Sequence, residues 1–294
     1  MERVPYAEGL LSPISETQYN KDSVVKRFLK NRLAVVGMLI ICIFAVVAIS
    51  APWIVPYSFQ AQNLGNLYAA PSSAHWFGTD NFGRDVFSRV IYGARISLVI
   101  GLISVGIGCS IGTLVGIVAA WCGGVTDRIA MCIIDIMQAV PGLLLAISLS
   151  AAMGPGLINA MIAVGISSIP AYARIVRGSV LNVKGLDFIN AAIVSGAGSV
   201  RIIRRHILPN ILAPIVIQAS AGMAGAILTA ASLSFIGLGV QPPAAEWGSM
   251  ISAGRAYIQK AWWIVTFPGI AIMITVCALN LLGDGLRDAL DPKE

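Results

Sequence analysis

Long apolar runs separated by polar stretches dominate the pattern of this sequence. A helix needs about 20 apolar residues to cross the hydrocarbon core of a bilayer, which is about 30 Å thick. Six runs meet or approach that length, and they cover residues 33–55, 96–121, 129–153, 157–173, 211–236 and 261–283. Backbone amides in hydrocarbon must be paired within their own segment, so each run is predicted to be a helix. The fourth run is the shortest, and Pro170 lies near its end.

The pattern therefore predicts an all-α membrane protein with about six transmembrane helices. We expect, in chain order, a cytoplasmic N-terminal segment over 1–32, a first transmembrane helix over 33–55, an extracytoplasmic segment over 56–95, a five-helix core over 96–283 with a long polar loop at 174–210, and a cytoplasmic tail over 284–294.

Basic residues are distributed unevenly between the two sides that six crossings define. Of the 20 Lys and Arg residues, five fall on one side: Arg84, Arg89, Arg95, Arg255 and Lys260. The other 15 fall on the side that carries both termini. Loops rich in Lys and Arg stay in the cytoplasm, so both termini are predicted to be cytoplasmic. An odd number of crossings would abolish this asymmetry.

Residues 21–33 interleave apolar and basic side chains before the first span. One interpretation is a basic amphipathic helix that lies at the cytoplasmic interface. The other is a plain positively charged flank of the span, and the pattern fits both equally. Inside the second span, Gly108, Gly112 and Gly116 recur every four residues, which predicts close packing of that helix face on a neighbouring helix.

Composition agrees with a membrane protein and argues against a nucleic-acid-binding protein. The 294 residues are 57% hydrophobic and 12% charged, with a mean hydropathy of +0.81. The net charge of +6 comes mostly from loops and reads as a topology signal. The sequence has no GxxxxGK[ST] loop to cradle ATP phosphates and no HExxH motif. Its two histidines, His75 and His206, fall on opposite sides of the membrane, so we expect neither catalysis nor a bound metal in this chain.

The segment 186–210, LDFINAAIVSGAGSVRIIRRHILPN, is the most informative stretch. It favours helix on both sides of Gly196, which should break the helix, and Pro209 should mark a boundary close to the next span. Its Phe and Ile residues are unnecessary in a solvated loop. We therefore expect a protruding cytoplasmic helical hairpin that docks on another protein.

This segment resembles the EAA loop of ABC importer permeases. Asn190, Ala191 and Ala192 take the EAA positions, Gly196 takes the glycine, and His206, Ile207, Leu208 and Pro209 take the I-x-L-P ending. Asn190 departs from the family Glu, and His206 departs from the first Ile. The resemblance implies that the loop is the coupling helix that fits a cleft of the ATPase subunit, and the Asn removes the basis for a salt bridge there.

Three further stretches are similar to the dipeptide and oligopeptide permease group. They are HWFGTDNFGRDVFSRVIYGAR at 75–95, SFIGLGVQPPAAEWGSM at 234–250 and NLLGDGLRDALDP at 280–292. With the EAA loop they run in the same order from about residue 21 to the end. The chain resembles the C-type subunit of the two paired permeases, which implies the type I importer permease fold.

The residues alone give a thinner account of the outer stretches. The charged residues Asp80, Arg84, Asp85 and Arg89 can pair in a folded turn, which we expect to be exposed and to add little stability. Such a turn is best explained as structural, with contact to a binding protein or partner permease as the alternative. Glu246 and Trp247 follow the proline pair of the last outer loop, where they belong either to an ordinary loop or to a gate or docking surface.

Polar residues inside the spans are candidates for the translocation path or for helix packing. Asp135 is the acidic residue well inside an apolar run, and a hydrogen bond between helices is favoured over substrate contact. Pro141 with the glycine after it is expected to kink that helix. Gln218, Asn159 and Asn280 are further candidates that should face the bundle.

The resemblance implies a permease subunit of a binding-protein-dependent importer in the inner membrane of a prokaryote. The implied partners are a homologous second permease, two cytoplasmic ATPase subunits that use ATP and Mg, an extracytoplasmic solute-binding protein and the lipid bilayer. The implied substrates are dipeptides or oligopeptides, with nickel, glutathione or a metallophore as alternatives. From another class, a stand-alone carrier or membrane enzyme is disfavoured because such proteins usually carry several intramembrane charges or an internal repeat.

Overall fold

The computed structural model describes residues 21–290, so the first twenty residues and the last four fall outside the described range. The predicted N-terminal segment 1–32 and tail 284–294 are therefore only partly described. Most of the described residues are helical and none forms a strand, which confirms the all-α prediction.

The described helices follow one another as α1 (Lys21–Lys30), α2 (Arg32–Ile54), η1 (Leu64–Asn66), α3 (Val86–Cys122), α4 (Gly124–Ala139), α5 (Gly142–Met153), α6 (Leu157–Lys184), α7 (Asp187–Val194), α8 (Ser199–Ile202), the π turn η2 (Ile203–Ile207), α9 (Leu208–Phe235), α10 (Trp247–Gly254), η3 (Arg255–Tyr257) and α11 (Trp263–Leu290).

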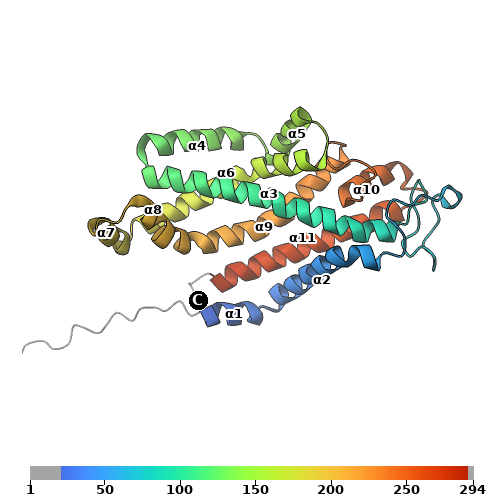
Figure 1. The fold of residues 1–294 in the computed structure, drawn as a ribbon, viewed down its shortest axis with the longest axis horizontal. Coiled ribbons are helices and arrows are strands. Elements are labelled where there is room, and N and C mark those ends of the chain that lie inside the picture. The colour runs from blue at the N-terminus through green and yellow to red at the C-terminus, as the bar shows by residue number, and fades with distance from the viewer. Residues whose placement is uncertain (1–20, 291–294) are drawn as a thin grey trace, which may run out of the picture.

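Long helices run side by side along the longest axis of the molecule (Figure 1). α3 packs most extensively on α6, and α11 packs on α2 and α9. At one end lie α1, the end of α11, α7 and α8, and at the opposite end lie α10 and the irregular residues before α3 (Figure 1). A bond of 3.0 Å from Asn31 Nδ2 to Asp288 Oδ2 joins the two ends of the described chain.

Among residues 21–290, five helices are long and apolar enough to cross a membrane. They are α2, α3, α6, the continuous run from α8 to α9, and α11. The pair α4 and α5 forms a sixth span if it is counted as one broken crossing. This count agrees with the predicted six.

The predicted span 129–153 is not one helix. α4 ends at Ala139, α5 begins at Gly142, and the two are bent by 90°. Pro141 explains the break because it cannot donate to the helix ladder and because it disfavours helical backbone at the residue before it. Val140 is accordingly extended, with φ −93° and ψ 129°. The expected kink is thus a complete interruption.

Three predicted boundaries move because polar residues extend the helices. α11 continues to Leu290, seven residues past the predicted end of the last span at 283. α3 begins at Val86 rather than near residue 96, with Asp85 as its N-cap, since Asp85 Oδ2 accepts a 2.8 Å bond from the Ser88 amide. α6 continues to Lys184, so the first eleven residues of the predicted loop 174–210 belong to a helix, and Pro170 lies inside it. Hydropathy alone ends a helix too early where the helix continues with polar residues.

Pro209 does not separate the loop from the next span. It lies in the first turn of α9, and the helix is continuous from Ser199 to Phe235. Because the run is continuous, another residue at this position would donate its N–H to the preceding turn, and the proline cannot. The π turn η2 directly before it widens the backbone where the proline ring would otherwise meet the preceding turn.

The glycine stripe of α3 faces α6, as its four-residue spacing predicts. A Cβ at Gly112 would lie 2.6 Å from Tyr172 Cβ, and one at Gly116 would lie 2.7 Å from the Ala173 carbonyl oxygen. At Gly108 a Cβ would overlap Ser168 Oγ. The predicted close approach of two backbones is confirmed.

Candidate functional site

The hairpin α7–α8 is anchored to the transmembrane helices by a buried isoleucine cluster. Ile189 of α7 and Ile202 of α8 are 0% and 1% exposed. They pack in one cluster whose other fully or nearly buried members come from α3, α6, η2 and α9: Ile117, Ala120, Val176, Val180, Ile207, Ile211 and Ile215. Lys184 Nζ ties the end of α6 to the end of α3, since it donates to the carbonyls of Ala120 and Trp121 at 3.1 and 2.7 Å. The hairpin is therefore packed against three spans, α3, α6 and α9.

Gly196 closes α7 with a Schellman motif. The Gly196 amide donates to the Ile193 carbonyl at 2.9 Å, and the Ala197 amide donates to the Ala192 carbonyl at 3.1 Å. This pair of bonds requires a left-handed residue after the helix, and Gly196 has φ +80°. The predicted helix break at Gly196 is confirmed.

The predicted coupling residues fall into an exposed and a packed group. Asn190, Ala191, Gly196 and Pro209 are exposed. Ala192 and Leu208 are half-buried and pack against the isoleucine cluster. The half-buried His206 ring lies 6.2 Å from the Phe188 ring, so the hairpin brings the start and the end of the motif together. Their role in coupling stays a prediction.

The tip of the hairpin presents apolar and basic side chains side by side. Val194 and Val200 are 89% and 69% exposed, and Ile193 and Phe188 are also exposed. Arg201, Arg204 and Arg205 follow in the exposed part of the next turns. Exposed apolar residues next to a basic rim are typical of a docking surface for a partner with an acidic edge.

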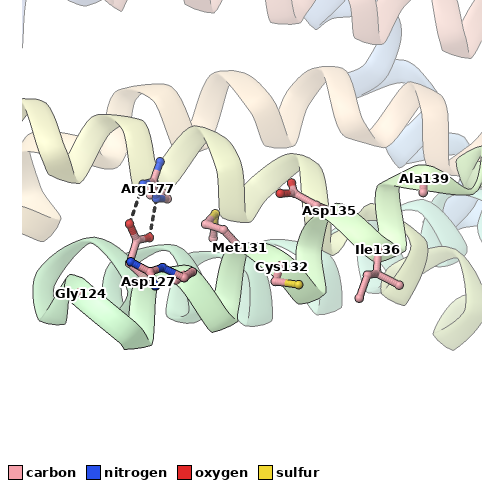
Figure 2. Close-up of a pocket in the computed structure, with 9 residues that line it drawn as sticks. Gly124, Asp127, Met131, Cys132, Asp135, Ile136, Ala139 and Arg177 are labelled. Carbon is pink, nitrogen blue, oxygen red and sulfur yellow. Dashed lines mark hydrogen bonds and ion pairs between the residues drawn. The ribbon is translucent and has the colours of Figure 1, made fainter.

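A second candidate site is an open groove of about 760 Å³ beside α4 and α6. Figure 2 shows its lining residues, with Arg177 of α6 directed at Asp127 of α4. The two side chains are joined by two bonds of 2.6 Å each, from Nε to Oδ1 and from Nη2 to Oδ2. Further along α4, Asp135 Oδ1 accepts a bond of 2.7 Å from Arg174 Nη2. Asp135 thus makes the helix-to-helix bond that the sequence favours.

The other intramembrane candidates are not gathered around this groove. The Asn159 amide donates to the carbonyls of Met153 and Gly154 at 2.9 and 3.0 Å, and so it closes the turn between α5 and α6. Gln218 is half-buried on α9, where its main-chain carbonyl accepts a 3.5 Å bond from the Tyr172 hydroxyl. The prediction that either one contacts a translocated solute is untested.

The groove arginines escaped the sequence analysis because they fell in the predicted loop 174–210. Their spacing is nevertheless informative once α6 is extended, since Arg174 and Arg177 are three residues apart and share one helix face. Asp127 and Asp135 are eight apart along one ridge of α4. The matched spacing of aspartates on one helix and arginines on the other could have indicated that the two helices pair.

The outer charged turn was predicted to be exposed, and it is buried. Asp80, Arg84, Asp85 and Arg89 are all 5% exposed or less. Asp80 Oδ2 lies 2.7 Å from Arg84 Nε and 3.7 Å from Arg89 Nε. Arg89 also donates to the Phe59 carbonyl at 2.9 Å. Asp85 Oδ1 lies 2.9 Å from His75 Nδ1. Hydropathy assigns charges to the surface, whereas these charges are paired inside a folded cap formed around residues 56–89. We call it the outer cap because the sequence predicts this segment to be extracytoplasmic.

Glu246 and Trp247 are buried rather than placed on an open surface. Trp247 is 0% exposed, and its indole donates to the Val90 carbonyl at 3.0 Å. Glu246 is the N-cap of α10 and accepts bonds of 2.8 Å from the amides of Gly248 and Ser249. The gate hypothesis for these two side chains is therefore replaced by a packing role.

Comparison with known families decides the identity of the chain. Residues 112–294, more than half of the sequence, match the family described as the binding-protein-dependent transport system inner membrane component. Residues 22–71 match the N-terminal TM domain of oligopeptide transport permease C. The chain belongs to the family of binding-protein-dependent transport system inner membrane components, the permeases of ABC transporters. It is therefore a multi-pass membrane subunit of an ABC transporter.

Several relatives resemble the permease over almost its whole length. The dipeptide transport system permease protein DppC of Alkalihalophilus pseudofirmus is 48% identical over 286 residues, which cover 96% of this chain and 94% of that protein. The di/tripeptide transport system permease protein DppC of Pseudomonas aeruginosa is 45% identical and covers 90% of each chain. The glutathione transport system permease protein GsiD of Pectobacterium atrosepticum is 47% identical over 91% of this chain and 89% of its own.

A solved structure supports the fold. An inward-facing conformation of the MetNI methionine ABC transporter aligns with a TM-score of 0.57 and 20% sequence identity. The alignment covers 70% of the permease and 98% of that chain. The permease has the type I ABC importer permease fold.

Proposed function

We propose that this permease imports dipeptides or oligopeptides as one half of a heterodimeric translocation path. The other half is a homologous permease, two cytoplasmic ATPases bind the hairpins and use ATP and Mg, and an extracytoplasmic binding protein delivers the solute. Both termini and the hairpin α7–α8 lie in the cytoplasm. The peptide assignment rests on the similarity to dipeptide and di/tripeptide permeases, and glutathione is the second candidate because one relative is a glutathione transport permease.

The observation that supports the coupling role is the rigid hairpin with an exposed tip. An isolated loop would not transmit motion, whereas α7 is buried at Ile189 and is exposed at Val194. Movement of the ATPases would displace α7 and, through the isoleucine cluster, the inner ends of α3, α6 and α9. Such a rigid-body movement is a known way to switch a helix bundle between two states.

Co-purification from membranes in mild detergent tests this proposal, with mass spectrometry of the bound proteins. We expect a second permease and one or two ATPases, and we expect Val194→Glu to remove the ATPases alone. Val125→Glu is the matched control, because Val125 is a 67% exposed valine at the α3–α4 turn. A chain that purifies alone, and that transports without ATP in liposomes, would instead be a carrier.

The substrate class is tested by uptake into vesicles that contain the whole transporter. Radiolabelled alanyl-alanine, glutathione and nickel are offered with the cognate binding protein. We expect ATP-dependent uptake of alanyl-alanine above the other two. Uptake of nickel alone would contradict the peptide assignment.

A further inference from the structure

The two Arg–Asp pairs in the α4–α6 groove differ in how fully they are engaged. Arg177 and Asp127 are joined by two hydrogen bonds that use both carboxylate oxygens. Their side chains are 33% and 21% exposed. Such a fork-to-fork pair is strong and geometrically fixed. It fastens the beginning of α4 to α6 (Figure 2).

The second pair keeps most of its bonding capacity. Arg174 and Asp135 share a single bond of 2.7 Å, and their side chains are 55% and 63% exposed. A guanidinium has five N–H donors, and a carboxylate accepts through both oxygens. Within the described part of the chain, no other bond of these two side chains is observed, so several donors and one oxygen remain available on the open side.

The position of this pair makes its exposure meaningful. Asp135 follows Asp127 by eight residues, which places it about 12 Å further along α4 at 1.5 Å per residue. The pair α4–α5 is long and apolar enough for one broken crossing. In such a segment a charged side chain is costly unless it faces protein or a water-filled space. The groove supplies that space, since Asp135, Cys132, Ile136 and Ala139 line it.

We propose that the Asp135–Arg174 pair is a contact site for a zwitterionic solute, with Arg174 binding a carboxylate and Asp135 binding an ammonium group. This inference rests on the proposed function and names two residues of the path. A peptide with free termini carries both groups. It can replace the internal ion pair by two intermolecular ones, so no charge is left unpaired during passage. The groove volume falls within the range of small-molecule sites.

The pair Asp127–Arg177 has a different part in this arrangement. Because both of its carboxylate oxygens are already bonded, it offers little to a solute. It fastens the beginning of α4 to α6 and so contributes to folding and assembly. Asp127 and Arg177 therefore supply matched controls of the same chemistry outside the proposed contact site.

The test uses the complete transporter in proteoliposomes with loaded binding protein, and it measures alanyl-alanine imported per ATP hydrolysed. We expect Asp135→Asn and Arg174→Gln each to lower this ratio about ten-fold or more, as expected for the loss of a charge-assisted hydrogen bond. ATP hydrolysis stimulated by the binding protein is retained. Asp127→Asn and Arg177→Gln are expected to lower the yield of assembled transporter. In the transporter that does assemble, the alanyl-alanine imported per ATP hydrolysed should stay unchanged.

A double variant separates solute contact from helix packing. Asp135→Leu with Arg174→Met removes the pair without leaving an unpaired charge, so a purely structural pair would recover the normal ratio. A contact site keeps the ten-fold loss. Recovery in the double variant, or a normal ratio in both single variants, overturns the inference.

Two further outcomes have separate meanings. Phosphatidylethanolamine also carries an anion and an ammonium group, so vesicles with and without it are compared. If the loss disappears without this lipid, the pair contacts lipid and the inference is overturned. If the unsubstituted transporter imports no peptide, the proposed function fails and the inference fails with it, an outcome distinct from normal transport by the variants.

Discussion

Gly196 combines two properties that mutation can separate. Its φ of +80° strains other L residues, yet nothing lies within 4 Å of a Cβ built there. A left-handed backbone costs most residues about 1–2 kcal/mol, whereas asparagine tolerates it. We expect ATPase co-purification to fall in the order Gly196→Asn, Gly196→Ala, Gly196→Val, with normal membrane levels by immunoblotting.

Gly198 is the matched control for this series. It also has open space around its Cβ position, but its φ is −67°. The same three substitutions at Gly198 should change co-purification little. Equal losses at both glycines would show that the handedness of the backbone is not what α7 requires.

Glu246 carries a pH dependence that follows from its burial. Burial raises the pKa of the carboxyl, and the amides of Gly248 and Ser249 oppose the rise by donating to the carboxylate. Folded protein thus holds the proton at higher pH than the unfolded chain, whose value is 4.5. The resulting contribution to the free energy of unfolding is complete below pH 4.5 and is lost as the pH rises through the folded value.

Glu246→Gln cannot titrate and should remove this dependence. The quantity to follow is the Tm of the unsubstituted permease minus the Tm of Glu246→Gln, both from melting curves in detergent. We expect this difference to fall as the pH rises from 4.5 to neutrality. Asp284→Asn, at an exposed position of α11, is the control and should show no such trend. A constant difference in Tm across this range would contradict the assignment.

α3 packs most extensively on α6, and Gly112 lies at a close approach of the two backbones. A Cβ there would meet Tyr172 Cβ at 2.6 Å, the Ile169 carbonyl oxygen at 2.8 Å and the Ala173 amide nitrogen at 3.0 Å. Overpacking of this kind costs about 1–3 kcal/mol. We expect Gly112→Ala to lower the Tm in detergent, whereas Gly106→Ala on the same helix has open space and should leave it unchanged or raised.

Helix existence was largely predictable from the sequence, because apolar length is the dominant signal in a membrane protein. The residues at which the helices begin and end were less predictable. α3 and α6 each carry a polar extension, and hydropathy does not distinguish such an extension from a loop. The 90° bend at Pro141 was predicted only as a kink, since a proline marks a break without fixing its angle.

The parts of the candidate site that depend on neighbouring residues could be predicted, and the parts that depend on distant residues could not. The hairpin and the αL glycine followed from local turn chemistry, which depends on a few neighbouring residues. The Asp135–Arg174 pair joins residues 39 apart in the sequence, and the Arg89–Ala244 bond joins residues 155 apart. Local pattern carries no information on such pairings, and the outer charges therefore looked like surface residues.

At the scale of the whole molecule, the outer cap depends on one carboxylate. Asp80 lies beside Arg84 and Arg89, both at most 5% exposed. Asp80→Asn would leave two buried cations without their anion, and removal of one partner of a buried pair costs about 3–5 kcal/mol. We expect Asp80→Asn to reduce the level of folded permease more than Arg84→Gln does, measured by fluorescence-detected size exclusion of a tagged chain.

Asp80→Asn should be the more damaging change because it leaves two buried cations unpaired, whereas Arg84→Gln leaves an ion pair in place. After Arg84→Gln, the Asp80 carboxylate still has Arg89 at 3.7 Å. Arg95→Gln, at an exposed position of α3, is the control for loss of an arginine as such. Equal levels of the Asp80 and Arg84 variants would show that the cap does not depend on neutralising both cations.

Arg89 also gives the outer cap a place in the biosynthesis of the chain. Its guanidinium bonds the Phe59 carbonyl early in the sequence and the carbonyls of Pro243 and Ala244 late in it. During translation, α3 enters the membrane long before residues 243–244 leave the ribosome. Until they arrive, Arg89 lacks two of its carbonyl acceptors, so the outer cap is completed only after most of the chain has been made.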